Sequence, residues 1–322
     1  MRRILCVIVA AVVGSLAVVP TAQAPAIDRS VLLRDLRVLS ADDMQGRQVD
    51  TPGGAKARAY IVERFKASGL EPIGASFEMP FEFSTGTPAA TRRGVNVVGR
   101  IKGSGGGSGG TGPASQYIVV SAHYDHLGVR GGQVYNGADD NASGTATLIS
   151  LARYFSSHRP THSLIFAAFD AEETGLRGSR AFVASPPVPR SAIVVNVNVD
   201  MVGRDVNNKL YAAGTFLNPF LKPFLQRVTP APPITLLLGH DDPNNKALED
   251  WTRDSDHWAF QQAGIPAIYL GEENYEQHHK VTDDYETIMP DFFVGAAETS
   301  VRVVEEFDRN LDQIARRAPA QK

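Results

Sequence analysis

The sequence predicts an α/β fold with three layers, in which helices cover both faces of a mixed, mostly parallel central sheet. Runs rich in β-branched and aromatic residues alternate with segments of helical periodicity. The runs are apolar almost throughout, as strands covered on two sides are. Acidic residues and histidines follow several of these runs directly, and open α/β sheets bind their ligands at the carboxyl ends of strands.

The composition is that of an ordinary globular protein. The chain has 322 residues, of which 43% are hydrophobic and 21% charged, and this excludes disordered and collagen-like proteins. Its length is sufficient to bury roughly three quarters of the unfolded surface. Lys and Arg total 32 against 35 for Asp and Glu, a formal net charge of −3. This balance gives no electrostatic case for a nucleic-acid partner.

Residues 1–24 are predicted to be a cleaved signal peptide. Two arginines precede an apolar run over residues 4–19, and a small-residue cleavage pattern ends at Ala24. An uncleaved membrane anchor is the alternative, but the run is shorter than the roughly 20 residues that span a bilayer. We therefore expect a secreted or periplasmic protein with no stable membrane insertion after cleavage. Cleavage removes Cys6, the only cysteine, and leaves residues 25–322 as a single catalytic domain without disulfides.

The order of predicted elements begins with two helices, over Val31–Leu39 and Ala55–Ala67, which carry apolar residues at helical spacing. A third helix, over Ala142–Phe155, lies between the second and third predicted strands. A closing helix shows one apolar face from Val294 to Leu311. The predicted strands are Val95–Ile101, Tyr117–His123, Leu164–Phe169, Ile193–Val199 and Ala267–Leu270.

Three connecting regions have distinctive compositions. Residues 103–112 are nearly all Gly and Ser, which indicates a flexible surface connection without chemistry. The segment from Pro230 to Asp254 is expected to form a rim or lid over a site. His158 and His162 fall between a helix and a strand and are expected to face solvent.

The first two chemical motifs lie at a strand end and at a helix start. In His123-Tyr124-Asp125, residues i and i+2 of a strand point to one side, so Asp125 is placed to hold the imidazole from behind while its other nitrogen meets a metal. A strand-end histidine paired with an acid is the alternative. Asp139 and Asp140 then occupy a turn flanked by glycines, where helix capping would explain one acid but not two.

The remaining motifs follow later strands. The side chains of Glu172 and Glu173 point in different directions because the residues are adjacent, so that one can bind metal while the other faces the attacking water. Solvated loop acids are the alternative. Asp200 ends a strand buried on both faces, where an unpaired carboxylate is costly, and a cation would pair it. His278 and His279 form the last motif, with a surface histidine pair as the alternative. Nitrogen and oxygen ligands without mature cysteine suit catalytic zinc.

These motifs resemble those of the bacterial double-zinc aminopeptidases, metallopeptidase family twenty-eight, which also contains glutamate carboxypeptidases and is related in fold to glutaminyl cyclases. Further matching segments are Leu39–Arg47, Pro52-Gly53, Ser255-Asp256-His257 and Ala263–Ala267. The resemblance implies two zinc ions, one held by His123 and Asp200 and the other by Glu173 and His279. It implies that Asp140 bridges both ions.

The resemblance also implies roles for neighbouring residues. Glu172 would be the general base, Asp125 would orient His123, and Asp283 would support His279. A cis peptide would follow Asp140.

The implied function is that of a secreted, monomeric aminopeptidase that acts on peptides. Glutaminyl cyclase, carboxypeptidase and a non-catalytic binding module are the alternatives. The short segment over residues 79–94 implies a compact form without a protease-associated domain.

Two histidines are not explained by the resemblance. Many relatives have Tyr where this chain has His278, which leaves the oxyanion donor open among His278, His257, Tyr275 and Tyr285. His126, three residues after His123, either lines the site or packs in the core.

Overall fold

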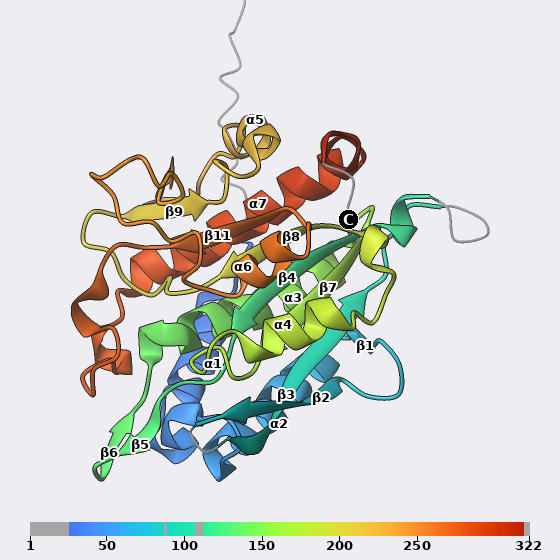
Figure 1. Cartoon of the computed structure of the whole chain (residues 1–322). Coiled ribbons are helices and arrows are strands. Elements are labelled where there is room, and N and C mark those ends of the chain that lie inside the picture. Colours follow the sequence, from blue (N-terminus) through green and yellow to red (C-terminus); the bar gives the residue numbers. More distant parts are fainter. Residues whose placement is uncertain (1–25, 87–88, 107–111, 319–322) are drawn as a thin grey trace, which may run out of the picture.

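The computed structural model describes residues 26–86, 89–106 and 112–318. Within these residues a sheet of nine strands runs through the middle of the molecule, and helices lie against both faces (Figure 1). The predicted three-layer α/β/α architecture with a mixed, mostly parallel sheet is confirmed. The predicted signal peptide, residues 1–24, lies outside the described residues.

Four parallel strands form the centre of the sheet. In spatial order they are β7 (Ser163–Phe169), β4 (Tyr117–His123), β8 (Ile193–Val199) and β11 (Ala267–Gly271). His123 at the end of β4 pairs with Phe169 at the end of β7, and Leu270 of β11 pairs with Val199 of β8. Because parallel strands end at one edge, the loops that follow them lie together.

The outer strands make the sheet mixed and were not predicted from the sequence. They are β1 (Glu71–Pro72), β2 (Glu78–Thr85), β9 (Lys209–Ala213) and β10 (Thr235–Leu238). Strand β2 pairs antiparallel along β3 (Ala90–Ile101), which is itself antiparallel to β7. A separate hairpin joins β5 (Gly128–Arg130) and β6 (Gln133–Tyr135). These strands are short or partly exposed and lack the long apolar runs that mark the central strands.

Helices divide between the two faces of the sheet. One face carries α1 (Arg29–Leu39), α2 (Pro52–Ala67), α3 (Gly144–Ser157), α5 (Lys222–Leu225) and α7 (Pro290–Arg317), and the other carries α4 (Arg177–Ala184) and α6 (His257–Gln262). The four predicted helices are α1, α2, α3 and α7. Asp28 and Thr51 begin α1 and α2 by accepting backbone N–H groups in the first turn. The short α4 and α6 were not predicted.

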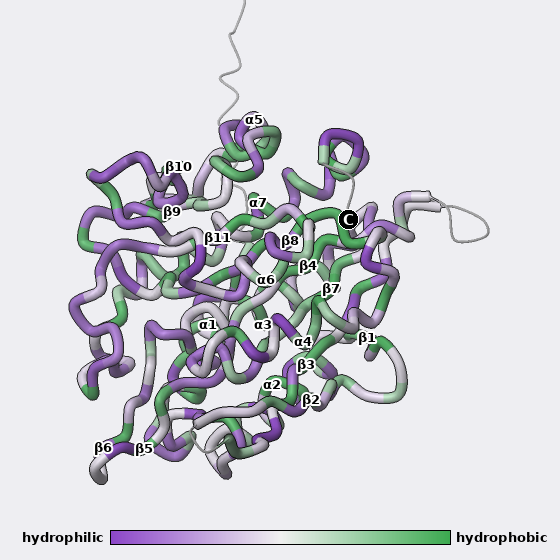
Figure 2. The backbone as a smooth tube through the Cα atoms, in the orientation of Figure 1, coloured by the Kyte–Doolittle hydropathy of each residue, from purple (hydrophilic) through white to green (hydrophobic). Residues whose placement is uncertain are grey.

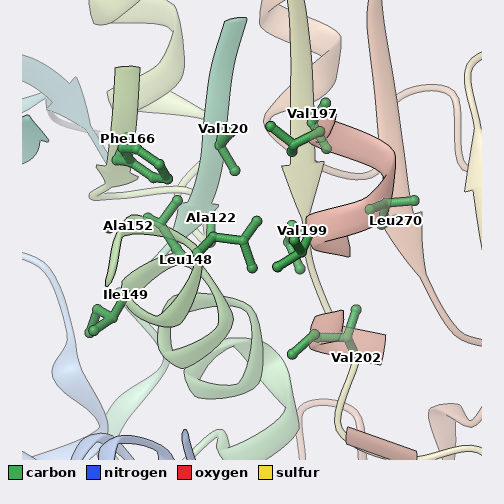
Figure 3. Packing of buried hydrophobic residues seen from close by; sticks show 14 of the residues in the cluster. Val120, Ala122, Leu148, Ile149, Ala152, Phe166, Val197, Val199, Val202 and Leu270 are labelled. Carbon is green, nitrogen blue, oxygen red and sulfur yellow. The ribbon is translucent and has the colours of Figure 1, made fainter. Parts of the chain in front are cut away.

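The apolar core has two parts because neighbouring residues of a central strand point to opposite faces. Ile118 and Val120 of β4 pack in the cluster that contains Leu148 of α3, whereas Val119 packs in the cluster that contains Phe182 and Phe260. Figure 3 shows Val120 and Leu148 in the first cluster, and Figure 2 shows hydrophobic residues gathered in the central strands. Burial on both faces explains the continuously apolar strands.

His162 is buried, so the prediction that it faces solvent is wrong. Its Nδ1 lies 2.9 Å from Asp308 Oδ1 of α7, and its backbone N–H donates to the same oxygen at 2.8 Å. His158 is exposed, as expected. Among the described residues, no helix combines the length and the apolar character needed to cross a bilayer.

Arg47 joins the opening helices to the loops at the end of the sheet. Its side chain is fully buried in the short helix Asp42–Arg47, and it donates to the carbonyl oxygens of Tyr124 (2.8 Å), Leu39 (2.7 Å) and Gly137 (2.9 Å). Burial lowers the pKa of Arg47 to about 10, which still leaves it charged at neutral pH. With Asn136 and Asp140 as the remaining acceptors, all five N–H groups of the guanidinium bind separate carbonyl oxygens, which a lysine cannot do.

Arg47→Met should destabilise the protein by about 3–5 kcal/mol, because it leaves several buried carbonyl oxygens without donors. The free energy of unfolding in urea measures the effect. Arg29→Met is the matched control, since Arg29 pairs with Asp291 at the surface and such pairs contribute about 1 kcal/mol or less. Equal losses in the two variants would contradict the role of Arg47.

Candidate metal centre

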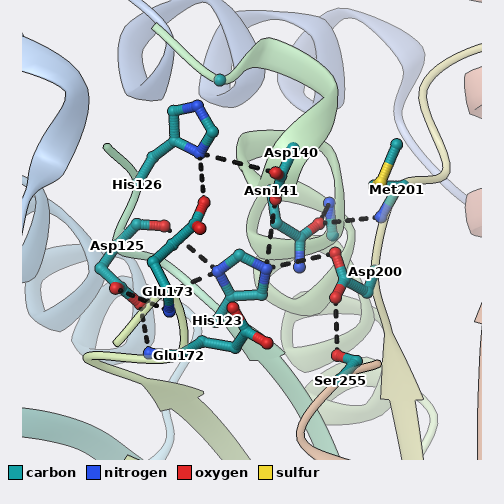
Figure 4. A network of polar contacts seen from close by, with 12 residues as sticks. His123, Asp125, His126, Asp140, Asn141, Glu172, Glu173, Asp200, Met201 and Ser255 are labelled. Carbon is teal, nitrogen blue, oxygen red and sulfur yellow. Dashed lines mark hydrogen bonds and ion pairs between the residues drawn. The ribbon is translucent and has the colours of Figure 1, made fainter. Parts of the chain in front are cut away.

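The five side chains predicted as metal ligands converge at the carboxyl edge of the parallel strands. His123 ends β4, while Glu173 and Asp200 follow β7 and β8. Asp140 lies in the turn Ala138–Ser143 that leads into α3, and His279 lies in the loop after β11. Figure 4 shows four of them, His123, Asp140, Glu173 and Asp200, around one space.

The two oxygens of Asp140 face different ligand groups. Oδ1 lies 3.3 Å from His123 Nε2, which is 3.2 Å from Asp200 Oδ1. Oδ2 lies 3.3 Å from His279 Nε2, which is 3.0 Å from Glu173 Oε2. Asp140 therefore has the position of a ligand shared between two sites.

Electrostatics show that this cluster attracts positive charge. Hydrogen bonds to Asp140 and Glu173 raise the pKa of His279 to about 10. Burial by itself would raise the pKa of Asp140, but the imidazoles of His126 and His123 hold it well below its ordinary value. Buried carboxylates at this spacing repel one another unless a cation lies among them.

The donor set fits zinc. Within the described part of the chain, three groups of ligand atoms lie within 4.8 Å of one another, and all three contain Asp140. Their donors are imidazole nitrogens and carboxylate oxygens, which suit a catalytic zinc site. Glu173 Oε1 is buried without a hydrogen-bond partner, as expected of an atom meant for a cation.

Comparison with known proteins decides the family. The model of Peptidase family M28 matches residues 96–304. The chain belongs to peptidase family M28. A probable zinc metalloprotease of Leptosphaeria maculans is 26% identical over 259 residues, which cover 71% of this chain and 55% of that protein. The chain spans about half the length of such curated relatives.

Solved structures share the fold of this M28 chain. An aminopeptidase from Aneurinibacillus sp. strain AM-1 superposes with a TM-score of 0.67 at 16% identity, covering 87% of this chain and 93% of that one. The glutaminyl cyclase of Fimbriiglobus ruber superposes with a TM-score of 0.66 at 18% identity, covering 89% and 98%. At these identities the likeness is one of fold.

Asp125 lies beside His123, as predicted, and its carboxylate also holds the backbone of the two glutamates of the M28 site. Asp125 Oδ1 accepts the N–H of Glu172 at 3.0 Å, and Oδ2 accepts the N–H of Glu173 at 3.4 Å. The carboxylate is 3.8 Å from His123 Nδ1, whereas the Asp125 carbonyl oxygen is 3.1 Å away. The backbone carbonyl thus orients His123, and the side chain fixes the two neighbouring glutamates.

Asp283 supports Asp140, whereas the prediction assigned it to His279. Its carboxylate accepts the backbone N–H groups of Asp139 and Asp140 at 3.0 Å and pairs with buried Arg204. The Asp140-Asn141 peptide is cis, as the resemblance implied. Asp283 therefore holds the turn that presents the shared carboxylate.

Ser255 is a positioning residue that the sequence reasoning left without a role. Its hydroxyl donates to Asp200 Oδ2 at 2.6 Å and accepts from the Asn198 side chain at 2.8 Å. Asp200 Oδ1 is then left to face His123. The signal was present in the Ser255-Asp256-His257 motif, but only the fold shows which acid the serine meets.

A cavity of about 530 Å³ opens onto the ligand cluster. Glu172 and His278 lie on its wall, together with Trp251 and neighbouring residues from the segment predicted as a rim. Of the candidate oxyanion donors, Tyr275 also lines this cavity. His257 instead stacks on Tyr269, and Tyr285 packs against Arg37, which leaves His278 and Tyr275 as the donors that face a substrate.

Asp140→Ala should lower zinc content more than Asp200→Ala, because Asp140 belongs to both ligand groups and Asp200 to one. The rise in melting temperature on adding zinc should also disappear, since zinc stabilises the folded protein only when it binds the folded site. Elemental analysis after dialysis, with thermal unfolding of the same samples, measures both effects. Zinc content equal to that of the unaltered protein would contradict the shared position of Asp140.

Proposed function

We propose that this chain is an aminopeptidase that uses two zinc ions to hydrolyse the N-terminal peptide bond of its substrates. The observation that carries the proposal is the division of the Asp140 oxygens between two ligand groups, beside a cavity wall that contains Glu172. His123 and Asp200 would hold one ion, and Glu173 and His279 the other. Membership of a peptidase family supports peptides as the substrate class.

Bound zinc would lower the pKa of a coordinated water from about 16 towards 7 and polarise the peptide carbonyl. The carboxylate of Glu172 is placed to take the proton from the attacking water. It lines the cavity, makes no hydrogen bond to another described residue, and is held from behind through its backbone N–H by Asp125. Burial raises the pKa of Glu172 well above its ordinary value, and a raised pKa makes a carboxylate a stronger base.

The same carboxylate would return its proton to the leaving amine, because a base that has taken a proton becomes the acid of the next step. His278 and Tyr275 supply the donors on the cavity wall for the carbonyl oxygen. The Tyr275 hydroxyl is buried and has no hydrogen-bond partner among the described residues, so it is free to donate to a substrate.

The charge of the cavity supports exopeptidase cleavage. Glu249 and Asp254 lie on its wall outside the ligand groups, and Arg253 is the one arginine among the lining residues that the structure describes. A substrate with a free, protonated α-amine is attracted to this acidic wall, whereas a blocked one is not. The volume of about 530 Å³ accommodates the end of a peptide.

Glutaminyl cyclase is the second candidate, favoured by the superposition on the Fimbriiglobus ruber enzyme. The division of the Asp140 oxygens between two ligand groups supports hydrolysis with two metal ions instead. Export to the periplasm or medium, based on the leader pattern over residues 1–24, and action as a monomer complete the proposal.

A panel of aminoacyl chromogenic substrates tests the proposed activity. Substrates with a free amine should be cleaved, a chelator should abolish cleavage, and added zinc should restore it. N-acetylated peptides should remain intact. Cleavage of blocked peptides alone, or cyclisation of N-terminal glutamine without hydrolysis of any substrate, would contradict the proposal.

Glu172→Gln should keep the zinc content of the unaltered protein and lower kcat by about 10²–10⁴-fold, because the amide cannot take a proton. Glu63→Gln is the matched control, since Glu63 is an exposed acid that pairs with Arg64 and does not line the cavity. Steady-state kinetics and elemental analysis measure the two properties. A kcat near that of the parent would exclude Glu172 as the base.

A further inference from the structure

His126 lies against the half of the site that contains Glu173. The side chain is buried at 1% exposure, and its Nδ1 is 2.7 Å from Glu173 Oε1 and 3.6 Å from Asp140 Oδ2. The centre of its ring is 5.9 Å from that of His279. Figure 4 shows His126 directed towards Asp140 and Glu173 from the side opposite His123.

His126 Nδ1 and Glu173 Oε1 form a buried ion pair at 2.7 Å, although the two atoms lack the alignment of a hydrogen bond. The other ring nitrogen of His126, Nε2, is buried and has no hydrogen-bond partner among the described residues. An imidazole nitrogen and a carboxylate oxygen that meet beside Asp140 are donors of the kind that bind catalytic zinc.

We infer that His126 is a further ligand of the second metal, which it binds through Nδ1 together with Asp140, Glu173 and His279. The inference rests on the proposed function, because it concerns one of the two ions proposed there. His126, Asp140 and Glu173 form one of the three groups whose ligand atoms lie within 4.8 Å of one another. The second ion then has two imidazole and two carboxylate ligands from the protein.

The backbone leaves room for this ring. Gly137 has a φ of +56°, and a Cβ at that position would lie 2.5 Å from His126 Cγ and Cδ2. A side chain at this position would therefore clash with the imidazole ring and with the backbone oxygen of Asp140, which would lie 2.1 Å from the Cβ. Arg47 holds the same glycine through its carbonyl oxygen at 2.9 Å, so the wall behind His126 is fixed.

His278 is the competing imidazole and fits a different role. Its Nε2 is 3.4 Å from Asp140 Oδ2, but among the described residues it makes no ion pair with Glu173. It lines the substrate cavity, where it is placed to contact a substrate. His126, in contrast, contacts both Asp140 and Glu173, which is the position expected of a further ligand of the second ion.

X-ray absorption spectroscopy at the zinc edge, measured on the protein with both sites loaded, counts the imidazole ligands of the zinc ions. His123 and His279 alone give an average of about one imidazole per ion, whereas His126 raises the average to about one and a half. His126→Ala should return the average to about one. The substitution should also lower the affinity of the protein for one of the two ions by at least about tenfold, measured by competition with a chromophoric chelator.

Three variants separate ligation from other effects. His162→Ala removes a buried imidazole that pairs with Asp308 away from the site, and His278→Ala removes an imidazole of the cavity; both should keep both ions bound as in the parent. His126→Asn places an oxygen near the position of Nδ1 and should restore part of the affinity. If His126→Ala does not fold, the parent spectrum and the Asn variant decide the question.

The outcomes distinguish the two levels of the proposal. A parent with two ions and an average of one imidazole per ion would overturn the ligation of His126 and leave the proposed function intact. The same applies if His126→Ala holds both ions as tightly as the parent. A parent that binds a single ion under zinc excess would overturn the proposed function itself.

Discussion

The carboxylate of Asp140 is the constraint on which the site depends, because each of its oxygens serves a different ligand group. A buried carboxylate costs several kcal/mol unless charges and donors surround it. The fold provides these from several directions. Asp283 and Arg47 hold the backbone of the turn, and the imidazoles beside the carboxylate supply positive charge when no metal is bound. Arg47, in the opening segment of the chain, therefore supports a site to which it contributes no ligand.

The parallel sheet explains why ligands distant in the sequence meet. Strands β4, β7 and β8 end at one edge of the sheet. The last residue of β4 is a histidine, and β7 and β8 are each followed within a few residues by an acid. Asp125 positions both Glu172 and Glu173, because its two carboxylate oxygens accept their consecutive backbone N–H groups. Both glutamates line the cavity, and Glu173 in addition contacts His279 of the ligand cluster.

The five side chains that meet at the strand ends could be picked out in the sequence, because strand ends and acidic or histidine pairs are local signals. The residues behind the ligands could not, since their partners depend on tertiary contacts. Asp283 was assigned to the nearest ligand in the sequence, but the fold brings it to the Asp140 turn. The edge strands, such as β2, also lacked the continuous apolar pattern that reveals a strand covered on both faces. The prediction that His162 faces solvent was wrong because its partner, Asp308, lies on the closing helix and is brought near only by the fold.

The most direct test of the account is a crystal structure of the zinc-loaded protein with anomalous diffraction measured at the zinc edge. The account predicts two peaks about 3.5–4 Å apart. One should touch His123 and Asp200, the other Glu173 and His279, and both should touch Asp140. A single peak, or two peaks of which only one contacts Asp140, would contradict the claim that this carboxylate is shared between two metal ions.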